Sequence, residues 1–276
     1  MTKYTIQHIK NFKGSGSPFA TLTAYDYTSA QILDAATIPL ILVGDSASMT
    51  IYGYDTTLPV SMDEMLLLVK SVSRGAKHSL VVADMPFMSY QASVEDAVKN
   101  AGRFVKEGGA GAIKLEGGSP YVSRIRAIID AGIPVMGHVG LTPQSVNQLS
   151  GYSVQGKDVK SAQKILDDAR AVEDAGAFSV VLECVPVELA AKITRSLSIP
   201  TIGIGSGPCC DGQIQVFHDI LGLVKNFTPK HAKVYVNLNK EISAALKRYA
   251  DDVSKKRFPN KKHSSSYKSN IIDKLQ

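Results

Sequence analysis

The feature that most restricts the fold of this 276-residue chain is a regular alternation of short apolar runs with amphipathic helical stretches. Eight runs of eight or nine residues are rich in Val, Ile and Leu, as strands buried on both faces of a sheet are. They cover residues 19–26, 38–45, 79–86, 111–118, 133–140, 178–186, 199–207 and 212–220. The last run is the weakest strand prediction, because it is equally compatible with the start of a helix.

The boundaries between these runs carry signals for helix and strand starts. Ser61 precedes a helical pattern and has Glu64 three residues later, which is the spacing of a capping box. Ser93 and Asp96 repeat the arrangement. An Ile-Pro pair introduces three of the predicted strands, at 38–39, 133–134 and 199–200. The chain therefore alternates strand and helix about eight times.

This alternation implies a parallel sheet, because each helix returns the chain to the same edge of the sheet. At this length an α/β fold of the closed (β/α)8 type, a TIM barrel, is the preferred solution, and an open, doubly wound sheet is the structural alternative. We expect one barrel domain over residues 1–250. Residues 251–276 are rich in Ser and Lys and poor in apolar residues, so we expect a partly disordered tail.

The net charge of +6 does not indicate a nucleic-acid-binding protein. Residues 251–276 contain seven Lys or Arg and three Asp, a net charge of +4, so only +2 remains for the rest of the chain. A solvated terminus explains such a tail better than a polyanion site does. No basic stripe interleaved with aromatic residues is present. We therefore expect no nucleic-acid partner.

Composition and the first residues predict a cytoplasmic protein without a membrane partner. The chain is 44% hydrophobic and 20% charged, and no apolar run approaches the roughly 20 residues that span a bilayer. The N-terminal sequence lacks the charged-then-apolar layout of a secretory signal. Cys184, Cys209 and Cys210 do not have zinc-ligand spacing, and we expect reduced thiols.

Polar residues gather at the carboxyl ends of the predicted strands, where barrels of this type carry their active sites. In chain order they are Asp26, Asp45, Ser46, Asp84, Lys114, Glu116, His138 and Glu183. Each has a plain structural explanation by itself. A strand-end Asp is usually a helix N-cap or turn residue, and a lone His is more often a hydrogen-bonded structural group. Convergence of all of them on one mouth favours an active site.

The run GAIKLEGG (111–118) places two opposite charges in an apolar strand. Successive side chains of a strand point to opposite faces, so Lys114 and Glu116 share one face while Ile113 and Leu115 share the other. Burying charges is costly, and pairing them often only breaks even. The run therefore indicates either a structural ion pair or an active site.

Three carboxylates on successive predicted strands indicate a metal site. Asp45, Asp84 and Glu116 would repel one another unless a cation neutralised them. An all-oxygen ligand set without His or Cys selects a hard ion, Mg²⁺ before Zn²⁺.

Long sequence blocks resemble a known family. They are LTAYDYTSA, VGDSASMTIYGYDTTLPVSMDEM, ADMPFMSYQAS, KEGGAGAIKLEGG, GIPVMGHVGLTPQSV, QLSGYSVQGK, LECVP and SIPTIGIGSGPCCDGQIQVFHDILGL. In this order, from about residue 4 to about residue 225, they resemble the blocks of the ketopantoate hydroxymethyltransferase family. The resemblance implies a barrel of the phosphoenolpyruvate/pyruvate-binding type and assembly into a homodecamer. It also implies transfer of a hydroxymethyl group from 5,10-methylenetetrahydrofolate to 3-methyl-2-oxobutanoate, giving 2-dehydropantoate for pantothenate and coenzyme A synthesis.

The resemblance also implies roles by position. The implied ligands of one Mg²⁺ per subunit are Asp45, Asp84 and Glu116. The implied contacts to the ketoacid are Asp45, Ser46, Asp84 and Lys114. Glu183 matches the proposed proton acceptor, while His138 is open between a positioning or relay role and a structural one. Leu68 and Asn147 stand where the family often has histidine, and Ser206 where it often has alanine, none of them at an implied metal or ketoacid position.

Two other functions remain open from the sequence. An enzyme of the isocitrate lyase or phosphonopyruvate type would also use Mg²⁺ and an enolate, but would be expected to carry a cysteine in a loop near the fourth strand. The segment KLEGGSPYVSR contains none. A non-catalytic ketoacid-binding barrel would be expected to lack at least one metal carboxylate, and all three are present.

Overall fold

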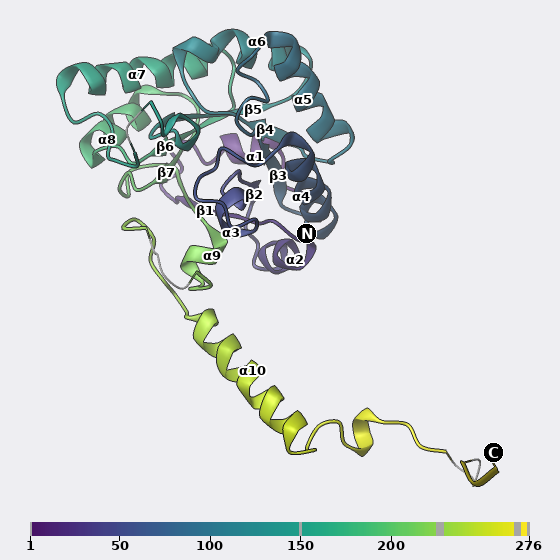
Figure 1. Cartoon of the computed structure of the whole chain (residues 1–276). Coiled ribbons are helices and arrows are strands. Elements are labelled where there is room, and N and C mark those ends of the chain that lie inside the picture. The colour runs from purple at the N-terminus through teal and green to yellow at the C-terminus, as the bar shows by residue number, and fades with distance from the viewer. Residues whose placement is uncertain (1, 149–150, 225–228, 268–271, 275–276) are drawn as a thin grey trace.

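The eight strands of this computed structural model, which describes residues 2–148, 151–224, 229–267 and 272–274, form a closed parallel barrel (Figure 1). They pair in sequence order, and β8 closes the barrel against β1. The strands are β1 (Phe19–Thr23), β2 (Leu40–Val43), β3 (Leu80–Asp84), β4 (Ala112–Lys114), β5 (Val135–Gly140), β6 (Ser179–Glu183), β7 (Thr201–Ile204) and β8 (Gly212–Gln215). The expected (β/α)8 barrel is confirmed, the open sheet is excluded, and the last apolar run does begin with a strand. Each Ile-Pro pair immediately precedes a strand, as predicted.

Helices surround the barrel, apart from a long one near the carboxyl terminus of the chain, and two of them start after Ser61 and Ser93, as the sequence predicts. The helices are α1 (Ile6–Lys10), α2 (Tyr27–Ala35), α3 (Ala47–Thr50), α4 (Met62–Gly75), α5 (Val94–Lys106), α6 (Val122–Asp130), α7 (Val159–Asp174), α8 (Val187–Ser196), α9 (Phe217–Ile220) and α10 (Leu238–Ser254). Ser61 and Glu64 form the expected capping box of α4, and the Ser93 side chain accepts from the backbone N–H of Asp96 in α5. No helix within the described residues has both the length and the apolar character needed to cross a membrane.

The period of two along each strand divides the core into an inner and an outer part. In β3, Leu80 and Val82 belong to a buried cluster inside the barrel, whereas Val81 and Ala83 belong to the cluster between sheet and helices. The same alternation holds in β2, β5 and β6. The inner cluster also contains Ile9 of α1. This helix therefore covers the amino-terminal end of the barrel, and the carboxyl end is left for the polar residues.

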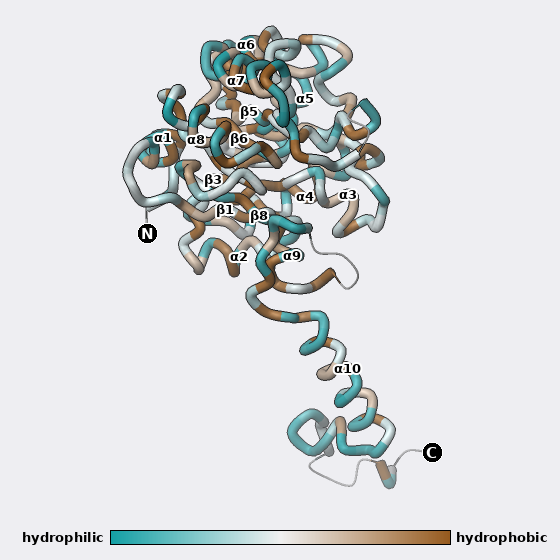
Figure 2. Tube along the Cα trace, turned by 90° about the vertical axis from the view of Figure 1, so that its left-hand side faces the viewer, coloured by the Kyte–Doolittle hydropathy of each residue, from teal (hydrophilic) through white to brown (hydrophobic). Residues whose placement is uncertain are grey.

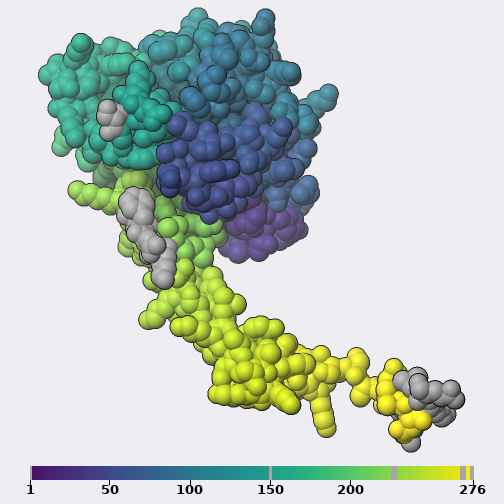
Figure 3. Space-filling model, in the orientation of Figure 1, coloured from purple at the N-terminus to yellow at the C-terminus, as the bar shows by residue number. Residues whose placement is uncertain are grey.

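The helix α10 extends away from the barrel (Figures 1 and 3), and none of its residues is buried. Apolar and polar residues alternate along it (Figure 2). Ile242, Leu246, Tyr249 and Val253 are all exposed, and their spacing places them on one face of the helix. The helix runs through residue 250, where the barrel domain was expected to end. Within the expected tail, residues 268–271 and 275–276 lie outside the described part.

Candidate active site

Strand alternation brings four of the predicted residues to the inside of the barrel mouth. Asp84, Lys114, His138 and Glu183 each continue the inward-facing series of β3, β4, β5 or β6. Lys114 thus faces away from Ile113 and Leu115, which pack in the outer cluster, as predicted. The side chains of these four residues are between 2% and 14% exposed. They form a buried polar layer on top of the apolar core of the barrel.

Contacts between oppositely charged groups connect this layer. Lys114 Nζ donates to Asp84 Oδ1 at 2.7 Å and Oδ2 at 2.8 Å, and lies 3.8 Å from Glu116 Oε1. His138 lies between two carboxylates, with Nδ1 3.4 Å from Glu116 Oε1 and Nε2 3.2 Å from Glu183 Oε2. The pair of charges in GAIKLEGG is therefore part of a larger network, rather than an isolated ion pair at a strand end.

Asp45 and Ser46 enter the site from the turn that joins β2 to α3. The backbone N–H of Asp45 donates to Asp84 Oδ2 at 3.1 Å, and Ser46 Oγ lies 2.8 Å from the hydroxyl of buried Tyr25. Asp26 does not belong to the site. Its carboxylate accepts from the backbone N–H and the hydroxyl of Ser29, so it caps α2, and the expectation that it joins the mouth is wrong.

The network contains more acidic side chains than cationic ones. Burial, followed by repulsion from Asp84 and Glu116, raises the pKa of Asp45 well above its usual range, although Lys114 opposes this. Burial also raises the pKa of Asp84 against the attraction of Lys114. Burial disfavours the ammonium of Lys114, but Asp84 and Glu116 outweigh that effect and raise its pKa. Both aspartates would therefore gain from a further cation.

His138 is held in its charged form. Burial and the nearby Lys114 ammonium favour the neutral imidazole, but the contacts with Glu116 and Glu183 outweigh them and raise the pKa of His138 to about 9. Burial likewise disfavours the ionised form of Glu116, yet its contact with His138 lowers the pKa of Glu116. The site thus brings four carboxyl groups (Asp45, Asp84, Glu116 and Glu183) together with two cationic side chains, Lys114 and His138.

The donor chemistry of the site fits Mg²⁺. Among the described residues, no three His, Cys, Asp or Glu side chains form a ready-made metal cage. Glu116 Oε1 is nevertheless buried without a hydrogen bond, and the surrounding carboxylates exceed the cations. Mg²⁺ prefers oxygen ligands, keeps several waters and needs only one or two protein carboxylates besides its substrate. The oxygens of Asp45, Asp84 and Glu116 therefore fit such an ion.

Three residues of the site are not predicted from the sequence. Gln144, Tyr90 and Tyr25 are buried, and each hydrogen-bonds a predicted site residue. Gln144 and Tyr90 lie in the segments that follow β5 and β3, where no strand period indicates their direction. The block GLTPQSV contains Gln144, but nothing in that block distinguishes it from a turn residue.

The departures from the family pattern lie outside the charged network. Leu68 of α4 is partly buried and packs against the outer hydrophobic core. Asn147 is exposed, and the Ser206 hydroxyl donates to the backbone carbonyl of Leu182.

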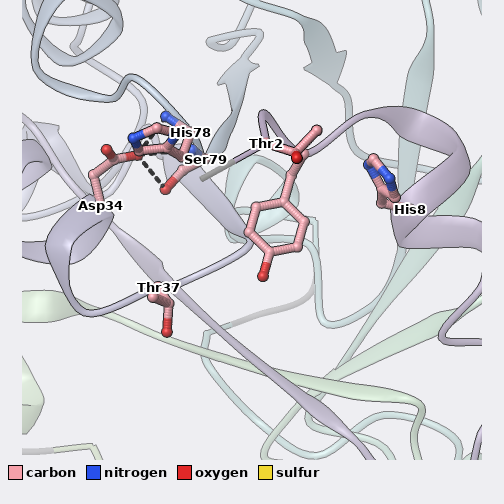
Figure 4. A pocket seen from close by; sticks show the side chains of 7 residues that line it. Thr2, His8, Asp34, Thr37, His78 and Ser79 are labelled. Atoms are coloured by element: carbon pink, nitrogen blue, oxygen red, sulfur yellow. Dashed lines mark hydrogen bonds between the residues drawn. The ribbon is translucent and has the colours of Figure 1, made fainter.

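A separate cavity of about 280 Å³ lies at the start of β3, at the other end of the barrel, and is lined by residues such as His8, Asp34 and His78 (Figure 4). Asp34 accepts there from the backbone N–H groups of His78 and Ser79, which explains its burial structurally.

The fold places this chain in the class of closed (β/α)8 barrels, and solved structures share it. A phosphonopyruvate hydrolase in complex with oxalate and Mg²⁺ aligns with a TM-score of 0.65 at 15% identity, covering 95% of this chain and 93% of that one. A phosphoenolpyruvate phosphomutase from Streptomyces platensis subsp. rosaceus aligns with a TM-score of 0.63 at 13% identity, covering 98% and 94%. At these identities the likeness shows a shared fold.

Sequence relatives then identify the family within that class. Residues 3–261 match the ketopantoate hydroxymethyltransferase family, and the chain belongs to it. A 3-methyl-2-oxobutanoate hydroxymethyltransferase of Carboxydothermus hydrogenoformans is 55% identical, covering 100% of both chains. One of Clostridium botulinum is 51% identical, covering 99% of both. The chain is thus a barrel of a transferase family, and the alternative of an enzyme of the isocitrate lyase or phosphonopyruvate type is set aside.

Proposed function

We propose that this chain converts 3-methyl-2-oxobutanoate, 5,10-methylenetetrahydrofolate and water into 2-dehydropantoate and tetrahydrofolate. The observation that carries the proposal is full-length membership of a family whose relatives bear this enzyme name, together with the charged network at the barrel mouth. A non-catalytic ketoacid-binding barrel is disfavoured, because Asp45, Asp84, Glu116 and Glu183 are all present and in one network.

The ketoacid binds, in this proposal, at the cationic part of the network. Lys114 neutralises the carboxylate of the substrate, and Ser46 orients it through its hydroxyl, which Tyr25 holds at 2.8 Å. Asp45 and Asp84 would hold one Mg²⁺ directly and Glu116 directly or through water. Lys114 occupies only part of the acceptor capacity of Asp84, because each carboxylate oxygen has two lone pairs. When bound, the ion would polarise the ketone and stabilise developing enolate charge.

The proton acceptor in this proposal is Glu183. The substrate C3–H is acidified by the adjacent ketone, and Glu183 removes this proton at the mouth, where its side chain is 14% exposed. The His138 imidazolium, 3.2 Å away, positions one carboxylate oxygen and leaves the other for the substrate. The resulting carbanion forms a C–C bond to the methylene carbon of the folate, and water supplies the hydroxyl group on that carbon. The two C–N bonds of the methylene carbon break, and the two nitrogens of the departing tetrahydrofolate take the proton from C3 and one proton from water.

Proton exchange tests the first half of this reaction without folate. In D₂O containing the protein and Mg²⁺, we expect the C3–H signal of 3-methyl-2-oxobutanoate to disappear from the proton NMR spectrum, and to persist when Mg²⁺ is omitted. A turnover assay with 5,10-methylenetetrahydrofolate then tests the second half. Exchange without folate-dependent product would contradict the proposed transfer. Neither exchange nor turnover would mean that the barrel serves another substrate.

The proposal extends to assembly and location. Self-association is supported by the exposed apolar face of α10, which a second copy of the chain would cover. The homodecamer is proposed from the resemblance to the family. A cytoplasmic location is supported by three unpaired cysteines, of which Cys209 is exposed. Residues 251–276 are proposed to be a basic tail that the reaction does not need.

A further inference from the structure

A single buried glutamine links several strand ends of the candidate active site. Gln144 lies in the short 3-10 helix η2 (Pro143–Ser145) after β5, and is 5% exposed. Its backbone N–H donates to Glu116 Oε2 at 3.0 Å, and its side-chain Nε2 donates to Asp45 Oδ2 at 2.9 Å. Gln144, which follows β5, therefore hydrogen-bonds the carboxylate of Glu116 after β4 and that of Asp45 after β2.

The orientation of the Gln144 amide is fixed by its other partners. Besides Asp45, Nε2 donates to the backbone carbonyl of Met85 at 2.9 Å. On the other side, Oε1 accepts from the Tyr90 hydroxyl at 2.9 Å and from Gln91 Nε2 at 3.0 Å. Both amide protons and both lone pairs of the amide oxygen are thus used. Turning the amide over would set Oε1 against the acceptors Asp45 Oδ2 and the Met85 carbonyl, and Nε2 against the donor Gln91 Nε2. The side chain cannot rotate without breaking four hydrogen bonds.

We propose that Gln144 is a positioning residue for the carboxylates that bind the cation and the ketoacid, an inference that rests on the proposed function. Gln144 donates to one oxygen of Asp45 and to one oxygen of Glu116, so it fixes the orientation of both carboxylates. Within the described residues, Asp45 Oδ1 accepts no hydrogen bond, and Glu116 Oε1 has only its longer contacts with His138 Nδ1 at 3.4 Å and Lys114 Nζ at 3.8 Å. Asp45 Oδ1 is therefore presented to a cation or its waters, and Glu116 Oε1 keeps acceptor capacity for them, in the way that outer hydrogen-bond partners orient ligands at other metal sites.

Only glutamine among similarly sized side chains can do this here. Methionine has a similar length but would leave Asp45 Oδ2 and the Met85 carbonyl buried without donors. Glutamate would add a further carboxylate beside Asp45. Asparagine keeps the amide but is one methylene shorter, so it cannot reach Asp45 and Tyr90 together from η2.

Calorimetric titration of the full-length protein with MgCl₂ alone tests this role, using Gln144→Met and Gln144→Asn. Gln213→Met is the matched control, because that partly buried glutamine also donates to a backbone carbonyl, that of Gly207, but contacts none of the site carboxylates. Removing an outer partner of a metal ligand weakens metal binding about 10–100-fold, so we expect a Kd for Mg²⁺ raised by that factor in Gln144→Met. Gln144→Asn should raise it at least about 10-fold, and the control should stay within about threefold of wild type.

The outcomes separate this inference from the proposed function. A cooperative thermal transition in each variant shows that it is folded, and if Gln144→Met does not fold, Gln144→Asn decides. Wild-type Mg²⁺ affinity in a folded Gln144 variant would overturn the positioning role while leaving the proposed function standing. Absence of both Mg²⁺ binding and Mg²⁺-dependent C3–H exchange in the wild-type protein would overturn the two together.

Discussion

Replacing Lys114 by methionine should destabilise the protein strongly, because its ammonium is the cation in direct contact with Asp84. The Nζ–oxygen distances of 2.7 Å to Asp84 and 3.8 Å to Glu116 correspond to about 6 and 4 kcal/mol of attraction at an effective dielectric constant of 20. Removing the ammonium also removes the cost of burying it, which offsets several kcal/mol of the lost attraction. The net loss should therefore be about 3–5 kcal/mol, the range found when one partner of a buried pair is removed.

Urea unfolding at pH 8 and a fixed protein concentration measures this loss. A second variant, Lys114→Met with Asp84→Asn, removes both partners and should recover about 1–3 kcal/mol relative to the single variant. Lys164→Met is the control, because the Lys164 side chain is 69% exposed and its buried partner Asp168 keeps its hydrogen bonds from the backbone N–H and the hydroxyl of Ser119. This variant should cost less than about 1 kcal/mol.

The loss should also depend on pH. Without the ammonium, the folded-state pKa of Asp84 and Asp45, which burial already raises, rises further above the unfolded value. A carboxyl group with a raised folded pKa contributes stability below its unfolded pKa and loses it as pH rises through the folded pKa. Lys114→Met should thus be closer to wild type at pH 5 than at pH 8. A loss below about 1 kcal/mol at pH 8, or a double variant as unstable as the single one, would refute the reasoning.

Four further predictions concern the reaction, the tail and a second titrating group. Glu183→Gln should lower turnover by about 10²–10⁴-fold while calorimetry shows an unchanged ketoacid Kd, and near-normal turnover would exclude it as the base. Asp84→Ala should abolish Mg²⁺-dependent ketoacid binding, and calorimetry with unchanged affinity would contradict the metal assignment. Truncation after residue 258 should leave kcat and KM within about twofold of wild type, as expected for a solvated terminus; a large loss in a steady-state assay would give the tail a role. Burial raises the pKa of Asp219 to about 6, so the protonated form that burial favours is lost as pH rises through about 6. Asp219→Asn should therefore raise Tm at pH 8 and leave Tm unchanged at pH 4. An equal rise in Tm at both pH values would contradict this.

The sequence predicts those site residues whose direction follows from strand periodicity. An inward-facing side chain recurs every second residue, so the apolar pattern of β3 extends to Asp84, and that of β4 to Lys114. The closed barrel then brings the strand ends together without further information. Asp26 could not be assigned in this way, because a strand-end Asp that caps the next helix carries the same sequence signal as one that enters the mouth.

Periodicity gives no information beyond the strand ends. Gln144 and Tyr90 reach the site from segments whose backbone path depends on turns and on the side chains they meet. Their polar atoms also look unremarkable in sequence, since loops are normally polar. Only their burial, and the requirement that buried polar groups be paired, distinguishes them. Outer partners of a site therefore become visible only when the loops are in place.

The charge balance of the mouth explains why this cluster indicates chemistry rather than stability. Four buried or partly buried carboxylates face two cations, and burial alone disfavours the ionised form of Asp45 and Asp84. Apolar side chains of similar volume at such positions are often neutral or stabilising by about 1–4 kcal/mol. The inner barrel immediately below the cluster is packed with such side chains, including Val82, Met136 and Val181. Folding therefore does not require charge at this level of the barrel, whereas the proposed binding of an anionic ketoacid together with a divalent cation does.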